Sequence, residues 1–360
     1  MKTIIYKLGD NETNTDIITR AGNIIKQGGL VAFPTETVYG LGGDAINEAS
    51  ANRIYTAKGR PADNPLIIHI CRINDIESIA KEIPDIFYTL AATFWPGPLT
   101  MILKKSPNVP LSTTGGLDTV AVRMPNHQTA LSLIDASGGF VAAPSANTSG
   151  RPSPTVGKYV IEDMDGRVDM ILDGGETVLG LESTILDLTG KQPEILRPGV
   201  ITEAMLTPVI KGKIINTPLV INVPDKPPRA PGMKYRHYAP RGQMTIISGN
   251  EKAVVSYINN RLKADEENNL IAGVIASTQM FHEYQTEHKK CIGDRLNEED
   301  IAHNLYRILR EFDDENTDVI YSEAFADTGL GQAIMNRLLK AASYRIIEVN
   351  EASQKGNKII

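Results

Sequence analysis

Residues 119–144 read TVAVRMPNHQTALSLIDASGGFVAAP, which predicts a strand, a helix and a second strand in immediate succession. The run TVAVRMP places Thr119, Ala121 and Arg123 on one face of a strand, because side chains alternate along an extended chain. Another apolar run, LTMILKK at residues 99–105, precedes it with no helix predicted between the two. Consecutive strands mixed with helices are typical of an α/β or α+β domain with a mixed, twisted sheet, rather than of a strict βαβ repeat.

The sequence before and after this stretch continues the mixture of helices and strands. Residues 14–27 carry apolar side chains at helical spacing and end at a Gly-Gly pair before the apolar run LVAFP. The same criteria predict further helices at 46–59 and 74–95, and further strands at 65–70, 169–175, 183–189 and 194–199. We place the end of this first domain near residue 210, so that it spans residues 1–210.

Residues 211–241 differ in composition from the first domain, and two interpretations remain open for them. Six prolines fall within residues 215–241, which is typical of a stiff interdomain linker. The same segment carries cationic and aromatic side chains that could close over an anionic, aromatic ligand. These side chains are Arg229, Lys234, Tyr235, Arg236, His237, Tyr238 and Arg241.

Residues 242–350 alternate strand and helix regularly, with strands predicted at QMTIIS, NLIAGVIAS and TDVIYSE. Such alternation predicts a small parallel α/β domain with Rossmann-like topology. Its first turn contains no glycine fingerprint for a dinucleotide. Residues 351–360 are expected to form an exposed tail.

The composition excludes several classes of protein. The formal net charge of −6 argues against a protein that coats nucleic acid through bulk charge. The chain has 2 cysteines, far apart, so a disulfide framework is not expected. Because there is neither a signal peptide nor a run of 18 apolar residues, we expect a cytoplasmic protein with no membrane partner. The motifs of P-loop enzymes, zincins, α/β-hydrolases and protein kinases are missing.

The run FPTETVYGLGGDA at residues 33–45 follows a predicted strand and admits three interpretations. Gly40, Gly42 and Ala45 fit the G-x-G-x-x-(G/A) spacing of a dinucleotide loop. The glycines also fit a plain tight turn. Together with Thr35 and Thr37, they fit the wall of a ligand pocket.

Three side chains shortly after this run have both structural and functional interpretations. Lys58 and Arg60 lie at the end of a predicted helix, where cations stabilise the helix dipole. On a loop loosened by glycine they could also converge on one phosphate or carboxylate. His69 shares a strand face with Ile67, where a histidine is more often a satisfied buried group than a catalyst.

Further polar side chains gather at strands and strand ends. Arg123 is costly to bury in an apolar strand without an anionic partner, so either an acidic side chain or a ligand carboxylate is expected to pair with it. Such a collection of cations and short hydrogen-bonding groups suits a polyanionic ligand such as a nucleoside triphosphate. The remaining members are Ser145, Asn147, Ser149, Arg151, Ser153, Ser183, Thr184 and Arg197.

Seven runs in this order resemble the YrdC-like domain of threonylcarbamoyl-AMP synthases: FPTETVYGLGGDA, KGRPADNPL, FWPGPLTMIL, TVAVRMP, PSANTSGRPSPT, STILDL and ILRPG. With PGMKYRHYAP and the second α/β domain, almost the whole chain is similar to the long, two-domain form of that family. The resemblance implies a nucleotidyltransferase that joins L-threonine, bicarbonate and ATP, bound as Mg-ATP, into threonylcarbamoyl-AMP with release of pyrophosphate. Partner proteins would then modify adenosine 37 of tRNAs that read codons beginning with A, without stable tRNA binding by this chain.

The resemblance also implies roles for individual residues. Lys58 and Arg60 would be the catalytic cations, and no protein ligand for a metal is assigned. The threonine site would consist of Thr37, His69, Arg123, Ala143 and Ser183. The ATP site would consist of Arg60, Asn64, Thr119, Ser145, Asn147, Ser153, Arg197 and either His237 or Tyr238.

No nucleophile stands out, so we expect catalysis by positioning and charge neutralisation, with the proline-rich segment as a lid that excludes water. Two other classes of function remain open. An RNA-binding module would show RNA affinity that falls steeply with salt. A carbamoyl-handling or dinucleotide enzyme would need a further domain or a better glycine fingerprint.

Overall fold

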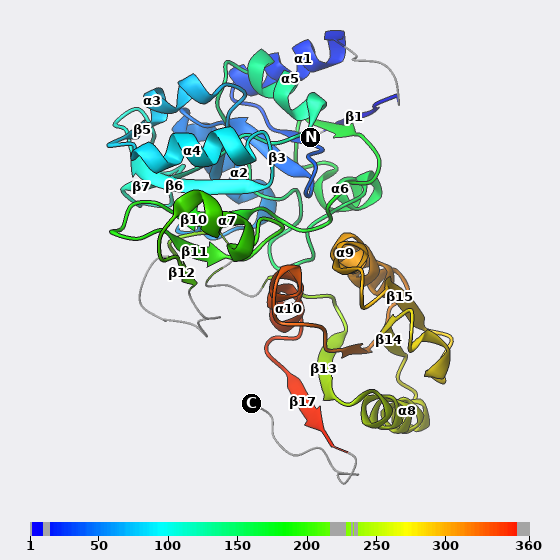
Figure 1. Cartoon of the computed structure of the whole chain (residues 1–360). Coiled ribbons are helices and arrows are strands. Elements are labelled where there is room, and N and C mark those ends of the chain that lie inside the picture. Colours follow the sequence, from blue (N-terminus) through cyan, green and yellow to red (C-terminus); the bar gives the residue numbers. More distant parts are fainter. Residues whose placement is uncertain (1, 10–14, 217–227, 232, 234–236, 351–360) are drawn as a thin grey trace. The chain divides into compact units, whose positions relative to one another are not determined.

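The computed structural model describes residues 2–9, 15–216, 228–231, 233 and 237–350 (Figure 1). The chain divides into two compact units, and each is described by itself. The first consists of Met1–Ser149 and Ser153–Tyr235, and the second of Gly150–Pro152 and Arg236–Ile360. The second unit therefore includes three residues that lie, in sequence, within the polar run after residue 144.

Among the described residues, a 12-stranded mixed sheet forms the centre of the first unit. Its strand order is β1-β9-β2-β3-β8-β4-β7-β6-β10-β11-β12, and β5 pairs with β6. The predicted mixed sheet is confirmed, because β4 runs parallel to β7 whereas β6 runs antiparallel to β7. The strands are β1 (Ile4–Lys7), β2 (Val31–Phe33), β3 (Gly40–Asp44), β4 (Ile67–His69), β5 (Ala80–Lys81), β6 (Leu99–Lys105), β7 (Thr119–Arg123), β8 (Val141–Ala142), β9 (Met170–Asp173), β10 (Thr184–Asp187), β11 (Glu194–Arg197) and β12 (Ile215–Asn216).

The helices of the first unit pack against this sheet. The continuous helix predicted at 74–95 is wrong, because a 3-10 turn (Ile73–Asp75), α3, β5 and α4 divide it and Pro84 caps the start of α4. Helices α6 and α7 and strands β1 and β3 were not predicted. The helices are α1 (Thr15–Lys26), α2 (Glu48–Lys58), α3 (Ile76–Ile79), α4 (Asp85–Phe94), α5 (Gln128–Ala136), α6 (Gly157–Met164) and α7 (Glu203–Ile210).

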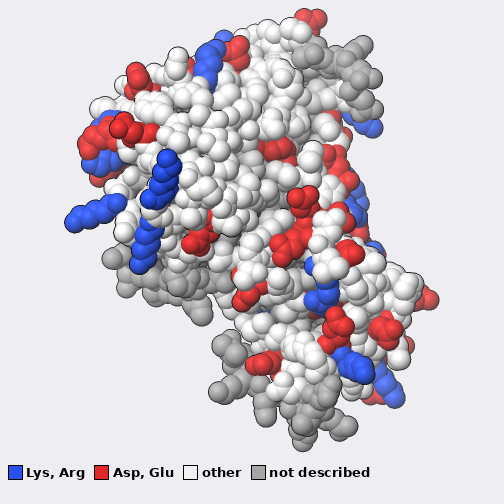
Figure 2. All heavy atoms as spheres, viewed as in Figure 1, with Lys and Arg blue, Asp and Glu red and all other residues white. Residues whose placement is uncertain are grey.

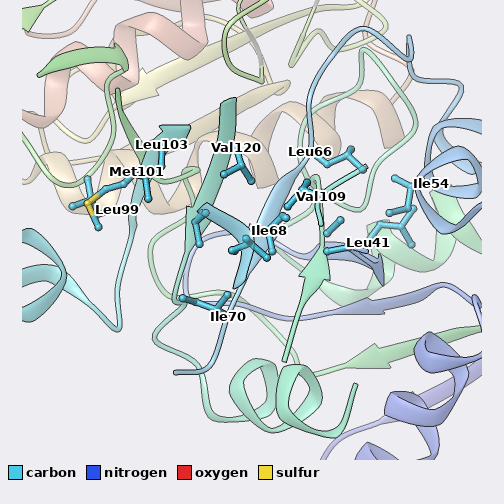
Figure 3. Packing of buried hydrophobic residues seen from close by; sticks show 14 of the residues in the cluster. Leu41, Ile54, Leu66, Ile68, Ile70, Leu99, Met101, Leu103, Val109 and Val120 are labelled. Carbon is cyan, nitrogen blue, oxygen red and sulfur yellow. The ribbon is translucent and has the colours of Figure 1, made fainter. Parts of the chain in front are cut away.

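One face of the central strands forms the main hydrophobic core (Figure 3). Leu99, Met101 and Leu103 of β6 point into it together with Ile68 of β4 and Val120 of β7. All five side chains are buried. Since side chains alternate along a strand, the intervening residues of these strands point to the opposite face.

The glycine-rich run after Thr37 is a strand and not a phosphate-binding loop. Residues Gly40–Asp44 form β3, which pairs antiparallel with β2, so both the dinucleotide and the tight-turn interpretations are wrong. A Cβ atom on Gly42 would lie 2.8 Å from Val141 Cγ1 and 2.9 Å from Phe33 Cε1. Glycine is therefore required at this position by close side-chain packing.

The second unit has a sheet of 5 parallel strands in the order β15-β14-β16-β13-β17. The predicted parallel α/β alternation is confirmed, although the strand order is not the 3-2-1-4-5 of dinucleotide-binding folds. The elements are β13 (Gln243–Gly249), α8 (Glu251–Glu267), β14 (Ala272–Ser277), a 3-10 turn (Phe281–Glu283), β15 (Lys289–Gly293), α9 (Glu298–Asp314), β16 (Val319–Glu323), α10 (Leu330–Ala341) and β17 (Ile346–Val349). Across both units, none of the described helices combines the length and apolar character needed to cross a membrane.

Candidate active site

Strand pairing aligns three polar residues across the sheet of the first unit. His69 of β4 is the register partner of Arg123 of β7, and Arg123 is the partner of Thr100 of β6. Ser183, directly before β10, shares a hydrogen bond of 2.7 Å between its Oγ and Thr100 Oγ1. Three predicted site residues, His69, Arg123 and Ser183, are thus brought together with Thr100, which was not predicted.

Arg123 has an acidic partner in the structure. Its Nη2 lies 2.7 Å from Oε2 of Glu36, and the two side chains are only 5% and 8% exposed. Burial acts to raise the pKa of Glu36, but the positive charge of Arg123 at this short distance outweighs it and holds this pKa below its ordinary value. Glu36 is therefore ionised near neutral pH and forms a buried ion pair with Arg123.

The two threonines beside Glu36 are buried and linked to each other. Thr35 Oγ1 and Thr37 Oγ1 are 2.9 Å apart, and Thr35 Oγ1 donates to the carbonyl of Val38 at 2.7 Å. Both lie in the connection between β2 and β3. Thr37, a predicted threonine-site residue, thus adjoins the carboxylate that pairs with Arg123.

His69 is a neutral imidazole in this environment. Its Nδ1 lies 3.2 Å from the carbonyl oxygen of Ile67, and its ring meets Phe33 edge-on. Burial and then the charge of Arg123 lower the pKa of His69 to about 3. Ala143, another predicted threonine-site residue, donates its backbone N–H to the same Ile67 carbonyl at 2.9 Å.

Arg197 of β11 reaches Ser183 from the neighbouring strand. Its Nε donates to the Ser183 carbonyl at 3.1 Å and its Nη2 to the Ser183 Oγ at 3.2 Å. The guanidinium is buried. A second buried arginine is therefore connected through Ser183 and Thr100 to the strand that carries Arg123.

The predicted Lys-x-Arg and Ser-x-Asn motifs meet at the end of α2. Lys58 Nζ donates to the backbone carbonyls of Ser145 and Asn147. Ser145 Oγ donates to Asn147 Oδ1 at 2.5 Å. Gly59 adopts a left-handed conformation (φ 61°) and ends the helix there, which turns the chain toward Arg60.

Arg60 organises the loop that contains Asn64. Its Nε donates to the Asn64 carbonyl at 3.2 Å, and its Nη2 to the Pro65 carbonyl at 3.0 Å. The Asn64 side chain is buried, and its Oδ1 has no hydrogen-bond partner among the described residues. A buried amide oxygen in this state is a candidate ligand contact, because such atoms are normally satisfied.

Two further predicted ATP-site residues belong to other parts of the first unit. Ser153 is buried and its Oγ donates to Glu182 Oε1 at 2.7 Å. Thr119 is at the start of β7, on the same face as Arg123 but at the opposite end of the strand. Glu36 and Glu182 were both missed by sequence reasoning, since neither stands in a recognisable spacing relative to its partner.

Part of the proline-rich segment packs against the sheet of the first unit. Ala230 is fully buried in a cluster with Ile67, Ile102, Ala121, Ile185 and Leu196, and Met233 packs against it. Ile67 and Ala121 lie on the same strand faces as His69 and Arg123. Arg229 pairs with Asp187 and, at 2.9 Å, with Glu194. The linker interpretation is therefore wrong for Arg229, Ala230 and Met233, which contact the sheet. Lys234–Arg236 lie outside the residues that the structure describes.

His237 and Tyr238 belong to the second unit, and both are buried. The ring of Tyr238 lies 5.2 Å from that of Tyr306 in α9, and the Arg337 guanidinium lies 6.0 Å from its centroid. Tyr238 has a positive φ of 64°. The described residues contain no group of three histidine, cysteine or acidic side chains that could hold a metal ion.

Comparison with known proteins identifies relatives over nearly the whole chain. A family described as telomere recombination matches residues 23–199, and one described as threonylcarbamoyl-AMP synthase, C-terminal domain, matches residues 201–343. The threonylcarbamoyl-AMP synthase of Pyrococcus abyssi is 48% identical over 356 residues, covering 96% of this chain and 100% of that protein. The enzyme of the same name from Bacillus subtilis is 44% identical over 337 residues, covering 93% of this chain and 95% of that protein.

A solved structure supports the same relationship. The crystal structure of P. abyssi Sua5 complexed with L-threonine has a TM-score of 0.90 and 46% identity, covering 97% of this chain and 100% of that one. A P. abyssi Sua5 variant, in which a histidine and the tyrosine after it are replaced by alanine, has a TM-score of 0.91 and 45% identity, covering 98% of this chain and 100% of the other.

Proposed function

The chain belongs to the threonylcarbamoyl-AMP synthase family, and from this premise we propose that it forms L-threonylcarbamoyladenylate and pyrophosphate from L-threonine, bicarbonate and ATP. The observation that carries the proposal is the buried alignment of His69, Arg123 and Thr100, extended by Ser183 and Arg197. Such a surface offers cations and hydroxyls to an amino acid and to phosphates.

The threonine site is proposed around Arg123. A relative of this chain is known with L-threonine bound, and buried arginine is suited to a carboxylate because its guanidinium donates two parallel hydrogen bonds. Thr37, the backbone of Ala143 and Ser183 supply short polar groups around it. His69, neutral because burial lowers its pKa to about 3, can hydrogen-bond a substrate without adding charge.

The ATP site is proposed around the hydrogen-bonded residues Lys58, Ser145 and Asn147. Lys58 holds the carbonyls of Ser145 and Asn147, which fixes the wall formed by those residues. Arg60 and Arg197 supply charge for the phosphates, and the unpartnered Oδ1 of Asn64 supplies an acceptor. Ser153, Thr119 and either His237 or Tyr238 complete the proposed set.

The reaction would proceed by positioning and electrostatic stabilisation. The threonine amine attacks bicarbonate to give a carbamate, and a carbamate oxygen then attacks the α-phosphate while pyrophosphate leaves. Lys58 and Arg60 would offset the negative charge that develops on the phosphates. Magnesium would enter with ATP as part of the substrate, where it neutralises phosphate charge.

The proline-rich segment is proposed to act as a lid. Its residue Ala230 packs on the sheet face that carries His69 and Arg123. A lid in this position would exclude water from the carbamate and the adenylate, both of which hydrolyse. The product would pass to partner proteins that modify adenosine 37 of tRNA.

The test is a turnover assay with ATP and magnesium, in which L-threonine and bicarbonate are each present or omitted. Pyrophosphate and a threonylcarbamoyl adenylate are expected only when all components are present. Arg123→Met should lower turnover at least about 100-fold, since it removes a charged substrate contact. Arg53→Met is the matched control, because Arg53 forms an exposed ion pair with Asp169. A folded, ATP-binding protein without turnover would overturn the proposal.

A cationic RNA-binding surface is the second candidate function, and the charge distribution does not favour it. Figure 2 shows acidic and basic side chains interspersed on one face, where the described residues gather into no broad basic patch. Lys58, Arg60, Arg123 and Arg197 are buried, which suits a small ligand enclosed by the protein, whereas an extended RNA backbone requires a row of exposed cations. Salt-dependent RNA binding with no turnover would favour this candidate.

A further inference from the structure

The proposed reaction has a proton to remove before any carbon–nitrogen bond can form. The α-amino group of a peptide has a pKa of about 8, and in a free amino acid the adjacent carboxylate raises it further, so most threonine molecules carry an ammonium group near neutral pH. An ammonium group has no lone pair and cannot attack bicarbonate. A proton acceptor near the amino group would therefore accelerate carbamate formation.

The site offers few groups that could accept this proton. One of them, His127, interacts with the charge of Glu36, but burial lowers the pKa of His127 and makes it a weak base. His69 is a poor acceptor, because burial lowers its pKa to about 3. Lys58 donates to two carbonyls and is a cation. Glu36 is a buried carboxylate whose Oε2 contacts Arg123 Nη2.

The position of Glu36 follows from its contact with Arg123. In an α-amino acid the ammonium is attached one carbon away from the carboxylate. A threonine whose carboxylate binds Arg123 would therefore carry its ammonium close to the existing partner of that arginine. The buried Arg123–Glu36 pair is thus complementary to an amino-acid zwitterion, with a cation for the carboxylate and an anion for the ammonium.

We propose that Glu36 is a catalytic residue that accepts the proton of the threonine ammonium. This inference rests on the proposed function. The proton moves from the ammonium nitrogen to a Glu36 carboxylate oxygen, and the nitrogen lone pair then forms a bond to the carbon of bicarbonate. A hydroxyl of the adduct leaves as water with a second proton from nitrogen, which gives the carbamate. Glu36 later returns its proton to solvent.

Substrate binding would itself prepare Glu36 for this role. In the ligand-free protein, burial raises the pKa of Glu36, but the charge of Arg123 more than offsets this effect. A substrate carboxylate on Arg123 would neutralise part of that charge and leave the effect of burial less opposed. Glu36 would then bind a proton more strongly when threonine is present than when it is absent.

The first experiment compares Glu36→Gln with the unaltered protein from pH 7 to 9.5. Glutamine keeps the size and a hydrogen-bonding oxygen but accepts no proton, so kcat at pH 7 should fall about 100-fold or more. The deficit should shrink as pH rises, since the amine then loses its proton to solvent. Threonine affinity, measured by calorimetry, should also fall because glutamine offers no charge to the ammonium, so kcat is compared at saturating threonine. A normal kcat at pH 7, or a deficit that is the same at every pH, would overturn the proposal.

A second variant keeps the question answerable if Glu36→Gln does not fold. Glu36→Asp preserves the charge opposite Arg123 and displaces the carboxylate. Its deficit should be smaller with 4,4,4-trifluorothreonine than with threonine, because fluorine lowers the pKa of the amine. An equal deficit with both substrates would contradict a role in proton removal. Lack of adenylate formation by the unaltered protein would instead contradict the proposed function, so the two failures are distinguishable.

Discussion

His69 shows how one buried residue links the site to the stability of the fold. Its pKa is about 3 in the folded protein and near 6.5 when unperturbed, because burial penalises the imidazolium. Below pH 6.5 the unfolded chain takes up a proton that the folded protein does not bind. Through this residue, the free energy of unfolding is therefore highest above pH 6.5 and falls progressively as the pH falls toward 3.

We predict that His69→Gln weakens the pH dependence of unfolding. Each pH unit below 6.5 should cost the unaltered protein about 1.4 kcal/mol through this residue, or about 2 kcal/mol between pH 6.5 and 5. The variant should lack this part of the slope in urea-unfolding experiments. His282→Gln, at an exposed position, is the matched control and should keep the full slope. Equal slopes in the two variants would contradict the prediction.

The sequence identified most candidate residues by type but not their partners. Arg123 was recognisable because an arginine in an apolar strand requires an anion, yet Glu36 could be chosen only once β2, β3 and β7 were placed. The unsatisfied oxygen of Asn64 was equally hidden. Partner identity depends on tertiary packing, which local spacing does not encode.

At the scale of elements, strand register creates the site. The sequence predicted β4, β6, β7 and β10, but their neighbours in the sheet follow from packing between strands that are not consecutive. The glycine run did not predict strand β3, because close packing and not turn geometry requires glycine there. The sequence left a linker possible for the segment containing Ala230, because a composition of six prolines does not show which residues it contacts. In the structure Ala230 packs with residues of β4 and β7.

We predict that Arg229→Ala loosens the segment around Ala230. Arg229 is half-exposed and pairs with Asp187 and Glu194, so its loss should cost about 1 kcal/mol. Hydrogen exchange at the Ala230 amide should become faster, and turnover should fall because the proposed lid is less often closed. Arg53→Ala removes a comparable ion pair with Asp169 and should leave this exchange unchanged. Unaltered exchange in Arg229→Ala would argue against anchoring by these pairs.

At the scale of the whole molecule, the compact units do not follow a single cut in the sequence. The expected boundaries at 210 and 242 mark changes of composition, whereas Gly150–Pro152 groups with the second unit. Arg310 of α9 donates twice to the Pro152 carbonyl, at 3.1 and 2.9 Å. Asp313 pairs with Arg151, and Ala239 donates to the Gly150 carbonyl. No local sequence pattern predicts that these three residues group with the second unit.

We predict that Arg310→Met weakens ATP binding more than threonine binding. Arg310 is fully buried, and its loss leaves the Pro152 carbonyl without its donor, at a cost of about 1 to 3 kcal/mol. Because residues 150–152 continue the chain from Asn147 to Ser153, their displacement should disturb the proposed nucleotide wall. Calorimetric titration measures both affinities. Arg307→Met, on the same helix but partly exposed, is the control, and equal effects of the two variants would contradict the prediction.

The grouping of Gly150–Pro152 has a consequence for limited proteolysis. A protease that cuts the proline-rich segment would divide the chain into two fragments, and Gly150–Pro152 would remain in the first fragment. Arg310 and Asp313, which contact Pro152 and Arg151, would lie in the second fragment. The contacts between Gly150–Pro152 and α9 would then join two separate polypeptides. We expect the cleaved protein to elute as one particle in size-exclusion chromatography, with fragments that separate only in denaturant.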